Sequence, residues 1–183
     1  MKGRLLQGCD NKHYALQDFF ENNNRLKCRE CGCLLDPYYR SLRIDFKSNF
    51  DFSSTYEGVY IVSKRFKKYI QQEGYKNLIF YPVNEEQIFF YFQVLNSIIK
   101  IDVEKSGISY KEKCETCGHP SEIIGGFDIF IEQTLPLADG FYTTNIFWRS
   151  HYIFWPEILI GEDTYEKLMS QKFKGINMGN KVY

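Results

Sequence analysis

Four of the six cysteines occur as two copies of one short pattern, Cys-x-x-Cys-Gly. The first copy, CRECG, places thiols at Cys28 and Cys31, and the second, CETCG, places them at Cys114 and Cys117. Two intervening residues let the chain turn back so that both sulfurs face one ion, and the following glycine can adopt positive φ. Each copy is therefore typical of a zinc knuckle, which supplies two of the four ligands that a structural zinc ion requires.

The two knuckles together predict one tetrahedral site, in which Cys28, Cys31, Cys114 and Cys117 hold one structural Zn²⁺ per chain. Residues 32–113 separate the two pairs, so the ion is expected to join distant parts of one domain rather than to form a free-standing finger. Closing so long a loop restricts the unfolded chain. A catalytic zinc ion is not expected, because four thiolates leave no position for water.

Three other interpretations of the paired cysteines remain open: a redox pair, a disulfide and an iron–sulfur cluster. A redox Cys-x-x-Cys normally lies where a strand turns into a helix, and neither LLDPYYR nor HPSEII, which follow the pairs, predicts a helix. Two matching pairs also favour one shared ion. Cys33 and His119 follow the two knuckles at equivalent places, and either could replace a knuckle cysteine; packing around the ligands is the better interpretation.

The rest of the sequence contains no recognisable catalytic motif. Cys9 is an isolated thiol, and neither His13 nor His151 has a serine, cysteine or carboxylate partner at motif spacing. Gly125-Gly126 lacks the remaining pattern of a phosphate-binding loop. The sequence therefore predicts a protein that is not an enzyme.

Charge and hydropathy restrict the class of partner. The 23 basic residues balance the 23 acidic ones, so the formal charge of 0 gives no general attraction to nucleic acid or to an anionic membrane. No run of about 18 apolar residues could span a bilayer, and no apolar stretch of a secretory signal precedes Cys9. We therefore expect a soluble, cytoplasmic protein with no membrane partner, in which paired cysteines bind metals more often than they form disulfides.

Strands must provide most of the scaffold that positions the cysteines. The 16 Phe, 14 Tyr and 2 Trp occur largely in β-favouring runs such as IFFYFQV and FYTTNIFW. These runs indicate an aromatic core, because a platform that stacks single-stranded nucleic acid would need interleaved basic residues. Strands are predicted at residues 42–46, 59–61, 78–82, 87–103 (two strands hinged at Asn96-Ser97), 125–133, 141–148, 151–157 and 158–161.

Two main helices are predicted. The first runs from Lys64 to Glu73, with Ser63 as N-cap and Gly74 at the left-handed position that ends it. Its basic face is expected to be solvated surface rather than a phosphate site. The second begins at Glu162, within residues 162–178, where N-terminal acidic residues complement the helix dipole.

The two helical segments resemble each other when the chain is shifted by 98 positions, which places Ile70 on Leu168 and Tyr75 on Phe173. The sequence therefore predicts an α+β fold: a sheet-rich, aromatic-filled single domain of residues 1–183 with two main helices. Two related halves, about 28–105 and 106–183, would each carry one knuckle and share one zinc site that bridges distant segments.

The order of CRECG, IVSKRF at a helix start, EGYKNLIFYPV, VEKSG, CETCG and a terminal helix GEDTYEKLM resembles the double-CXXCG motif immunity proteins of bacterial polymorphic-toxin systems. The resemblance runs from about Cys28 to the C-terminus, although Gly161 stands where the family has a serine-led helix opening. It implies a cytoplasmic protein that binds and neutralises a cognate secreted toxin. Among site residues it carries over only the four knuckle cysteines.

The partner surface is expected to be acidic, at Glu157, Glu162 and Asp163, because many toxins act on nucleic acids and carry basic sites. The alternative function is a zinc-ribbon nucleic-acid-binding or regulatory module. It predicts a basic stripe near the knuckles, where the sequence has a mixed set of charges: Arg29, Glu30, Glu112, Lys113 and Glu115. A third alternative, a zinc-stabilised enzyme, would require a buried cleft with perturbed titratable groups.

Overall fold

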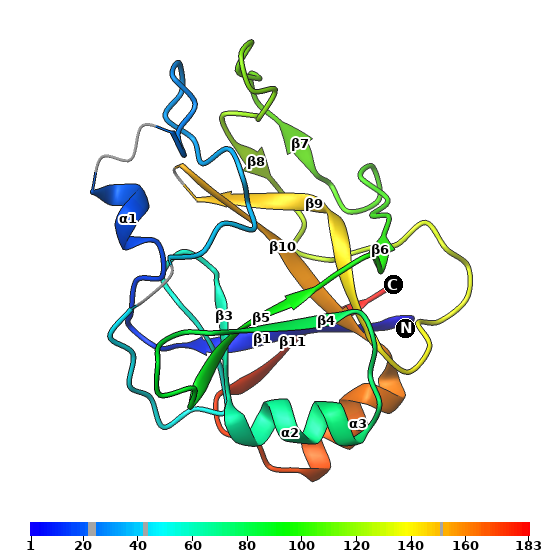
Figure 1. Ribbon diagram of the computed structural model, residues 1–183. Coiled ribbons are helices and arrows are strands. Elements are labelled where there is room, and N and C mark those ends of the chain that lie inside the picture. The colour runs from blue at the N-terminus through cyan, green and yellow to red at the C-terminus, as the bar shows by residue number, and fades with distance from the viewer. Residues whose placement is uncertain (22–24, 42–43, 151) are drawn as a thin grey trace.

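A computed structural model describes residues 1–21, 25–41, 44–150 and 152–183 of the chain. Strands predominate over helices among these residues (Figure 1), so the predicted sheet-rich α+β fold is confirmed. The elements are β1 (Gly3–Asp10), α1 (Gln17–Phe20), β2 (Phe52–Ser54), β3 (Tyr60–Ser63), α2 (Lys64–Gln72), β4 (Leu78–Pro82), β5 (Phe89–Val94), β6 (Ile98–Ile99), β7 (Ser109–Tyr110), β8 (Ile123–Ile124), β9 (Phe141–Ser150), β10 (Ile153–Ile160), α3 (Glu162–Ser170) and β11 (Ile176–Val182).

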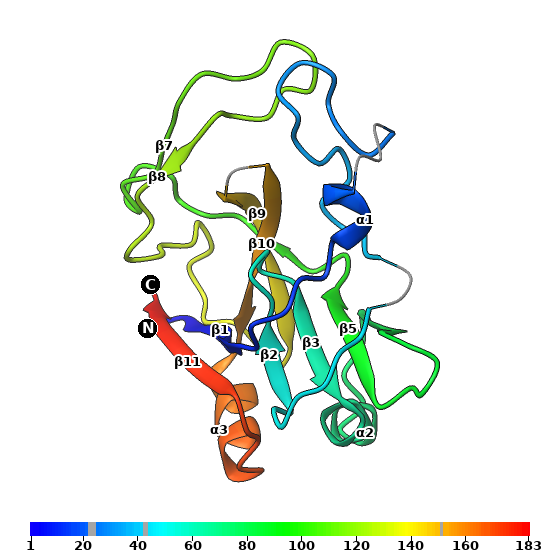
Figure 2. The ribbon, with the colours of Figure 1, turned by 90° about the vertical axis from the view of Figure 1, so that its left-hand side faces the viewer.

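Nearly all the strands join one sheet, with the order β4-β5-β3-β2-β1-β10-β9-β6 and with β11 paired to β1. Strand β1 connects the part of the sheet formed by β2 to β5 with the part formed by β6 and β9 to β11. It is antiparallel to β10 and β11 and pairs in parallel with β2 at Cys9 and Asp10. Helices α2 and α3 lie together at one end of the molecule, and the loops around β7 and β8 lie at the other (Figures 1 and 2).

Two units of the sheet have the same connectivity. In the first, β3 leads through α2 to β4, and β5 lies between β3 and β4, antiparallel to both. In the second, β10 leads through α3 to β11, and β1 lies between β10 and β11, antiparallel to both. Helices α2 and α3 begin and end 98 positions apart, the shift at which the sequence aligns. The second unit takes its central strand from the start of the chain, outside both expected halves.

The core beneath the two helices is aromatic, as the sequence predicts. Phe92 on β5 is 2% exposed, and its ring centroid lies 5.4–5.9 Å from those of Phe52, Phe66, Phe80 and Phe141. The same buried cluster includes Leu6 on β1 and Ile160 on β10, so it connects strands of both units. Edge-to-face and tilted ring pairs of this kind add to the stabilisation from burial alone.

The first predicted helix forms as α2, which begins at the predicted Lys64 and ends at Gln72, one residue before the predicted end. The Oγ of Ser63 accepts a hydrogen bond from the N–H of Phe66 at 3.2 Å, and Gly74 follows the helix with φ +74°. Helix α3 begins at the predicted Glu162 and ends at Ser170, where the chain turns into β11. The N-cap residue of α3, Gly161, has no side chain to cap it, and a Cβ there would lie 2.1 Å from the Ala138 carbonyl oxygen.

The predicted strand at residues 42–46 is wrong. Leu42 and Arg43 lie outside the described residues, and Ile44 and Phe46 are buried without belonging to a strand. Ile44 and Phe46 pack with Val83 and other apolar residues on the face of the sheet opposite α2. The alternating pattern therefore arises from a loop in which every second side chain is buried.

Two further strand predictions differ from the structure. Residues 125–133 form single bridges at Ile129 and Ile131 instead of a strand. The runs 151–157 and 158–161 merge into one strand, β10, whose register shifts between Pro156 and Ile158, while His151 lies outside the described residues. The bulge next to Pro156 interrupts the alternation of apolar residues along β10, so the sequence did not indicate one continuous strand.

The carboxylate of Asp51 connects the two units near the start of α2. It accepts hydrogen bonds from Ser63 Oγ at 2.8 Å, from the Arg65 guanidinium at 2.7 Å and from the backbone N–H of Lys174 at 3.0 Å. Asp51→Ala should lower the free energy of unfolding by about 2 kcal/mol, because Ser63, Arg65 and the N–H of Lys174 all lose their shared hydrogen-bond acceptor. Urea unfolding measures the change, and Asp45→Ala, at an exposed loop position, should change it by less than about 0.5 kcal/mol. Equal losses in the two variants would contradict this role of Asp51.

Candidate metal centre

Two loops at the end of the molecule remote from α2 and α3 carry the paired cysteines. Residues 25–36 follow α1 and contain Cys28 and Cys31, and residues 111–122 connect β7 to β8 and contain Cys114 and Cys117. The loops stand next to each other at the top of Figures 1 and 2. The structure brings together all four predicted cysteines, and their Sγ atoms lie within 4.8 Å of one another.

The two loops have the same local geometry. In the first, the N–H of Cys28 donates to the carbonyl of Cys33 at 2.8 Å, and the N–H of Gly32 donates to the carbonyl of Cys28 at 2.9 Å. The second loop repeats both bonds 86 positions later, at 2.9 and 2.8 Å. Gly32 and Gly118 have φ of +71° and +73°, a conformation that glycine adopts without steric cost. The sequence CxxCG therefore folds each loop into the same tight turn.

The spacing of the sulfurs fits a tetrahedral ion. The Sγ atoms of Cys28 and Cys114 are 3.8 Å apart, and those of Cys31 and Cys117 are 3.5 Å apart. Zinc–sulfur bonds of about 2.3 Å in a tetrahedron place sulfurs about 3.8 Å from each other. The donor set of four sulfurs suits a metal such as Zn²⁺ and fills its coordination shell, which leaves no position for a reactive water.

The electrostatics of the four thiols also favour a bound cation. Burial raises the pKa of the Cys31 thiol, but hydrogen bonds from Cys33 and from the neighbouring thiols lower it to about 6. Burial and hydrogen bonds to the other thiols raise the pKa of Cys117 to about 12. Ionising one thiol thus opposes ionisation of the next, and a divalent ion among them would allow all four to ionise.

The knuckles are also connected by Glu30 and Thr116, which hold equivalent positions in the two patterns. One carboxylate oxygen of Glu30 accepts hydrogen bonds from the Thr116 hydroxyl at 2.6 Å and from its backbone N–H at 3.2 Å. Hydrogen bonds from Thr116 and Cys114 lower the pKa of Glu30, which favours its charged form. Equivalent residues meet in pairs, so the site has approximate two-fold symmetry.

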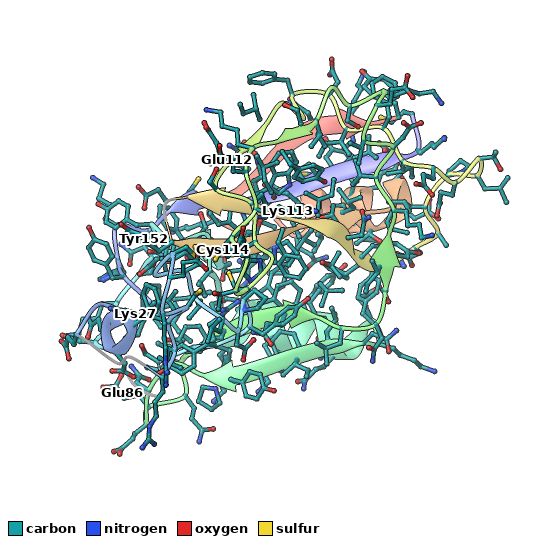
Figure 3. All side chains as sticks on the ribbon, turned by 90° about the horizontal axis from the view of Figure 1, so that it is seen from above. Lys27, Glu86, Glu112, Lys113, Cys114 and Tyr152 are labelled. Atoms are coloured by element: carbon teal, nitrogen blue, oxygen red, sulfur yellow. The ribbon has the colours of Figure 1, made fainter. Side chains whose placement is uncertain are left out.

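The loops are fixed to the β9–β10 hairpin. The N–H of Leu34 donates to the carbonyl of Tyr152 at 2.8 Å, and the His119 ring stacks on Phe154 with centroids 4.2 Å apart. Tyr152 and Cys114 are labelled in Figure 3, which views the molecule from above, the side on which the cysteine loops lie in Figure 1. Cys33 is fully buried and, like His119, lies outside the four-cysteine group. Both residues therefore pack near the ligands, as the sequence suggested. The contacts of Leu34 with Tyr152 and of His119 with Phe154 hold the metal centre against the β9–β10 hairpin.

His119→Ala should therefore leave the metal content unchanged while it removes the stack on Phe154. We expect a loss of about 1 kcal/mol in the free energy of unfolding, the value typical of an aromatic pair. Metal analysis by plasma mass spectrometry and urea unfolding measure the two effects. Loss of metal in this variant would make His119 a ligand and would contradict the four-cysteine set.

Of the three acidic residues expected at a partner surface, Glu162 and Asp163 lie in the first turn of α3, whereas Glu157 lies on β10. Glu157 on β10 turns its carboxylate inward to accept a hydrogen bond from the Tyr60 hydroxyl at 3.3 Å, and burial raises its pKa. Glu162 pairs with Arg4 at 2.8 Å, and Asp163 is exposed in the first turn of α3. The carboxylate of Glu157 is thus paired with Tyr60 rather than presented on the surface beside Asp163.

A group of basic residues beside the cysteines was missed. Two hollows of about 890 and 510 Å³ open next to the first cysteine loop, and both are lined by Arg25, Lys27, Cys28 and Arg29. The ammonium of Lys27 lies 4.9 Å from the centre of the Phe19 ring. The alternation of basic residues at 25, 27 and 29 is the signal that could have identified this surface. A zinc ion with four thiolates carries a formal charge of about −2, which these cations would offset.

No helix in the described part of the chain has the length and apolar character needed to cross a membrane. The chain matches no protein-family model, and a search of curated proteins finds no significant match.

Proposed function

We propose that this chain is a cytoplasmic immunity protein, which binds and neutralises a cognate bacterial toxin and uses one structural Zn²⁺ to hold its two cysteine loops together. The observation that carries the proposal is the convergence of CRECG and CETCG on one four-sulfur site. Paired motifs of this kind, in this order with the intervening segments, define the family that the sequence resembles. The metal then stabilises a binding protein and takes no part in chemistry.

Binding rather than catalysis is supported by the closed four-sulfur site and by the pairing of two buried titratable groups. Tyr60 and Glu157 have raised pKa values, caused first by burial, and they hydrogen-bond to each other between strands. The four sulfurs would surround a zinc ion completely, so a substrate would find no open ligand position. An inhibitor that acts by covering a toxin requires only a rigid surface with suitable anchors.

Co-expression tests this proposal. The product of the adjacent upstream gene should arrest growth when expressed alone, and co-expression of this chain should restore growth. The two proteins should also form a complex that survives size-exclusion chromatography. The proposal fails if the upstream product is not toxic, or if its toxicity persists in the presence of this chain.

The second candidate is a nucleic-acid-binding module, which the basic residues Arg25, Lys27 and Arg29 beside the cysteines favour. Such a module should bind DNA or RNA with an affinity that falls steeply between 50 and 200 mM salt, by about 10-fold or more for several phosphate contacts. The immunity proposal expects no such binding in fluorescence anisotropy with single- and double-stranded probes. Salt-sensitive binding that Arg29→Gln weakens would favour the second candidate.

A further inference from the structure

Arg40 is placed in an unusual position for a cation. Its Nε is shielded from solvent and has no hydrogen-bond partner among the described residues. One terminal nitrogen donates to the carbonyl oxygens of Pro37 at 3.0 Å and Tyr39 at 2.5 Å, and no ion pair of Arg40 is found in the described ranges. Burial lowers its pKa to about 10. Enclosing a guanidinium without an anionic partner costs several kcal/mol, so this arrangement is incomplete as it stands.

Glu57 and Asp36 act on Arg40 electrostatically, but the hydrogen bonds found for Arg40 among the described residues go to backbone carbonyls and not to these carboxylates. Both carboxylate oxygens of Glu57 accept hydrogen bonds from the backbone N–H of Ala15 at 3.0–3.1 Å. A carboxylate oxygen of Asp36 accepts a hydrogen bond from the N–H of Tyr38 at 2.8 Å. The Tyr91 hydroxyl, whose pKa burial raises above its usual range, is buried and also lacks a partner. The chain itself therefore does not supply the missing acceptor within the residues described.

A narrow pocket leads to Arg40 where the strands of the two units meet. Its volume of about 20 Å³ has room for one small polar group. Its lining includes Tyr38, Gly58, Gln93, Trp155 and Pro156.

The walls of this pocket are preformed. Tyr38 packs edge-on against Phe147 with centroids 5.7 Å apart, and its carbonyl accepts a hydrogen bond from Gln93 at 3.2 Å. Gly58 has φ +75°, and a Cβ at this position would lie 2.7 Å from the Trp155 ring. The glycine thus lets the indole pack closely against the β2–β3 turn.

The residue types at the pocket are those that dominate the energetics of protein interfaces. Arginine, tyrosine and tryptophan carry most hot spots, typically in central sites from which water is excluded. Tyr38, Arg40 and Trp155 are each half-buried, so they remain reachable from the surface while the Nε of Arg40 is shielded. A carboxylate is the planar acceptor that a guanidinium binds best, and one of its oxygens, about the size of a water molecule, fits the pocket.

We propose that this pocket receives one aspartate or glutamate side chain of the partner protein, and that Arg40 and Trp155 form the centre of the toxin-binding surface. The inference rests on the proposed function for the identity of the partner. It reverses the expected charge pattern, because here the partner supplies the acidic group and this chain supplies the cation. The aromatic rim would exclude water from the ion pair and so strengthen it.

Binding of the upstream gene product to three proteins tests the interface. Isothermal titration should give an affinity for Arg40→Gln about 100-fold weaker than for the wild type, because the partner carboxylate is left buried and unpaired. Lys68→Gln, which removes an exposed cation on α2, should bind within threefold of the wild type. The proposal would be overturned if Arg40→Gln bound the upstream gene product with an affinity within threefold of that of the wild type.

A second measurement keeps the pocket testable without the toxin and separates loss of binding from loss of folding. The Nε–Hε NMR signal of Arg40, identified by its absence in Arg40→Lys, should shift and saturate as sodium formate is added, but not with sodium chloride at equal ionic strength. Absence of saturation, or an equal response to chloride, would overturn the carboxylate site. Saturation by formate without any toxin binding by the wild type would instead support the carboxylate site while overturning the immunity proposal.

Discussion

Replacing any one of Cys28, Cys31, Cys114 or Cys117 with serine should release the zinc ion and separate the two cysteine loops. The expected zinc content falls from about one ion per chain to below about 0.2, because three thiolates without the fourth bind zinc far more weakly. The Sγ atoms of the four residues lie within 4.8 Å of one another, so no ligand is peripheral. All four variants should therefore behave alike.

The same variants should be markedly less stable. The ion connects segments 86 residues apart, and losing such a link restores about 4.6 kcal/mol of loop entropy to the unfolded chain in the cross-link approximation. Metal analysis and thermal unfolding with and without a chelator measure the two effects. Acidification should also release zinc, because protons compete for the thiolates.

Cys33→Ser is the matched control for the four ligand variants. Its side chain is fully buried beside the first knuckle, with Sγ 3.9 Å from the carbonyl oxygen of Cys31, but it lies outside the cluster. We expect about one zinc ion per chain in this variant. Zinc loss equal to that of Cys31→Ser would show that the ligand set is wrong.

Phe92→Ala should have the largest effect of any core substitution considered, about 3–5 kcal/mol of the free energy of unfolding. The Phe92 ring contacts four other aromatic rings from β2, α2, β4 and β9, so its removal leaves a cavity where the two units meet. Urea unfolding followed by circular dichroism measures the change. Zinc should remain bound in the folded variant, because the cysteine loops lie at the other end of the molecule (Figure 1).

Phe127→Ala provides the control for Phe92→Ala, since Phe127 is 86% exposed. Its free energy of unfolding should change by less than about 0.5 kcal/mol. Similar losses at the two positions would mean that the aromatic cluster does not hold the units together.

Local chemistry explains why some elements were predictable from sequence. The knuckles and α2 are specified by neighbouring residues: two cysteines with a glycine, and Ser63 with Gly74 at the helix ends. Alternation of apolar residues was misleading at 42–46, because the buried loop there packs Ile44 and Phe46 against the sheet without joining it. Periodicity reports which side chains are buried, whereas strand pairing depends on backbone partners distant in sequence.

Two features of the site region depend on tertiary structure alone. The register shift between Pro156 and Ile158 turns Glu157 toward Tyr60, so its place in an acidic stretch gave no indication that it is buried. The enclosure of Arg40 results from strands of both units meeting beside it. Neither the bulge nor the meeting of the units has a local sequence signal.

X-ray absorption at the zinc K-edge of the purified protein tests the central claim most directly. The account predicts about one zinc ion per chain, surrounded by four sulfur atoms at about 2.3 Å and by no nitrogen or oxygen. A shell that contains nitrogen or oxygen, or protein that contains no zinc after expression in zinc-supplemented medium, would contradict the closed four-cysteine centre.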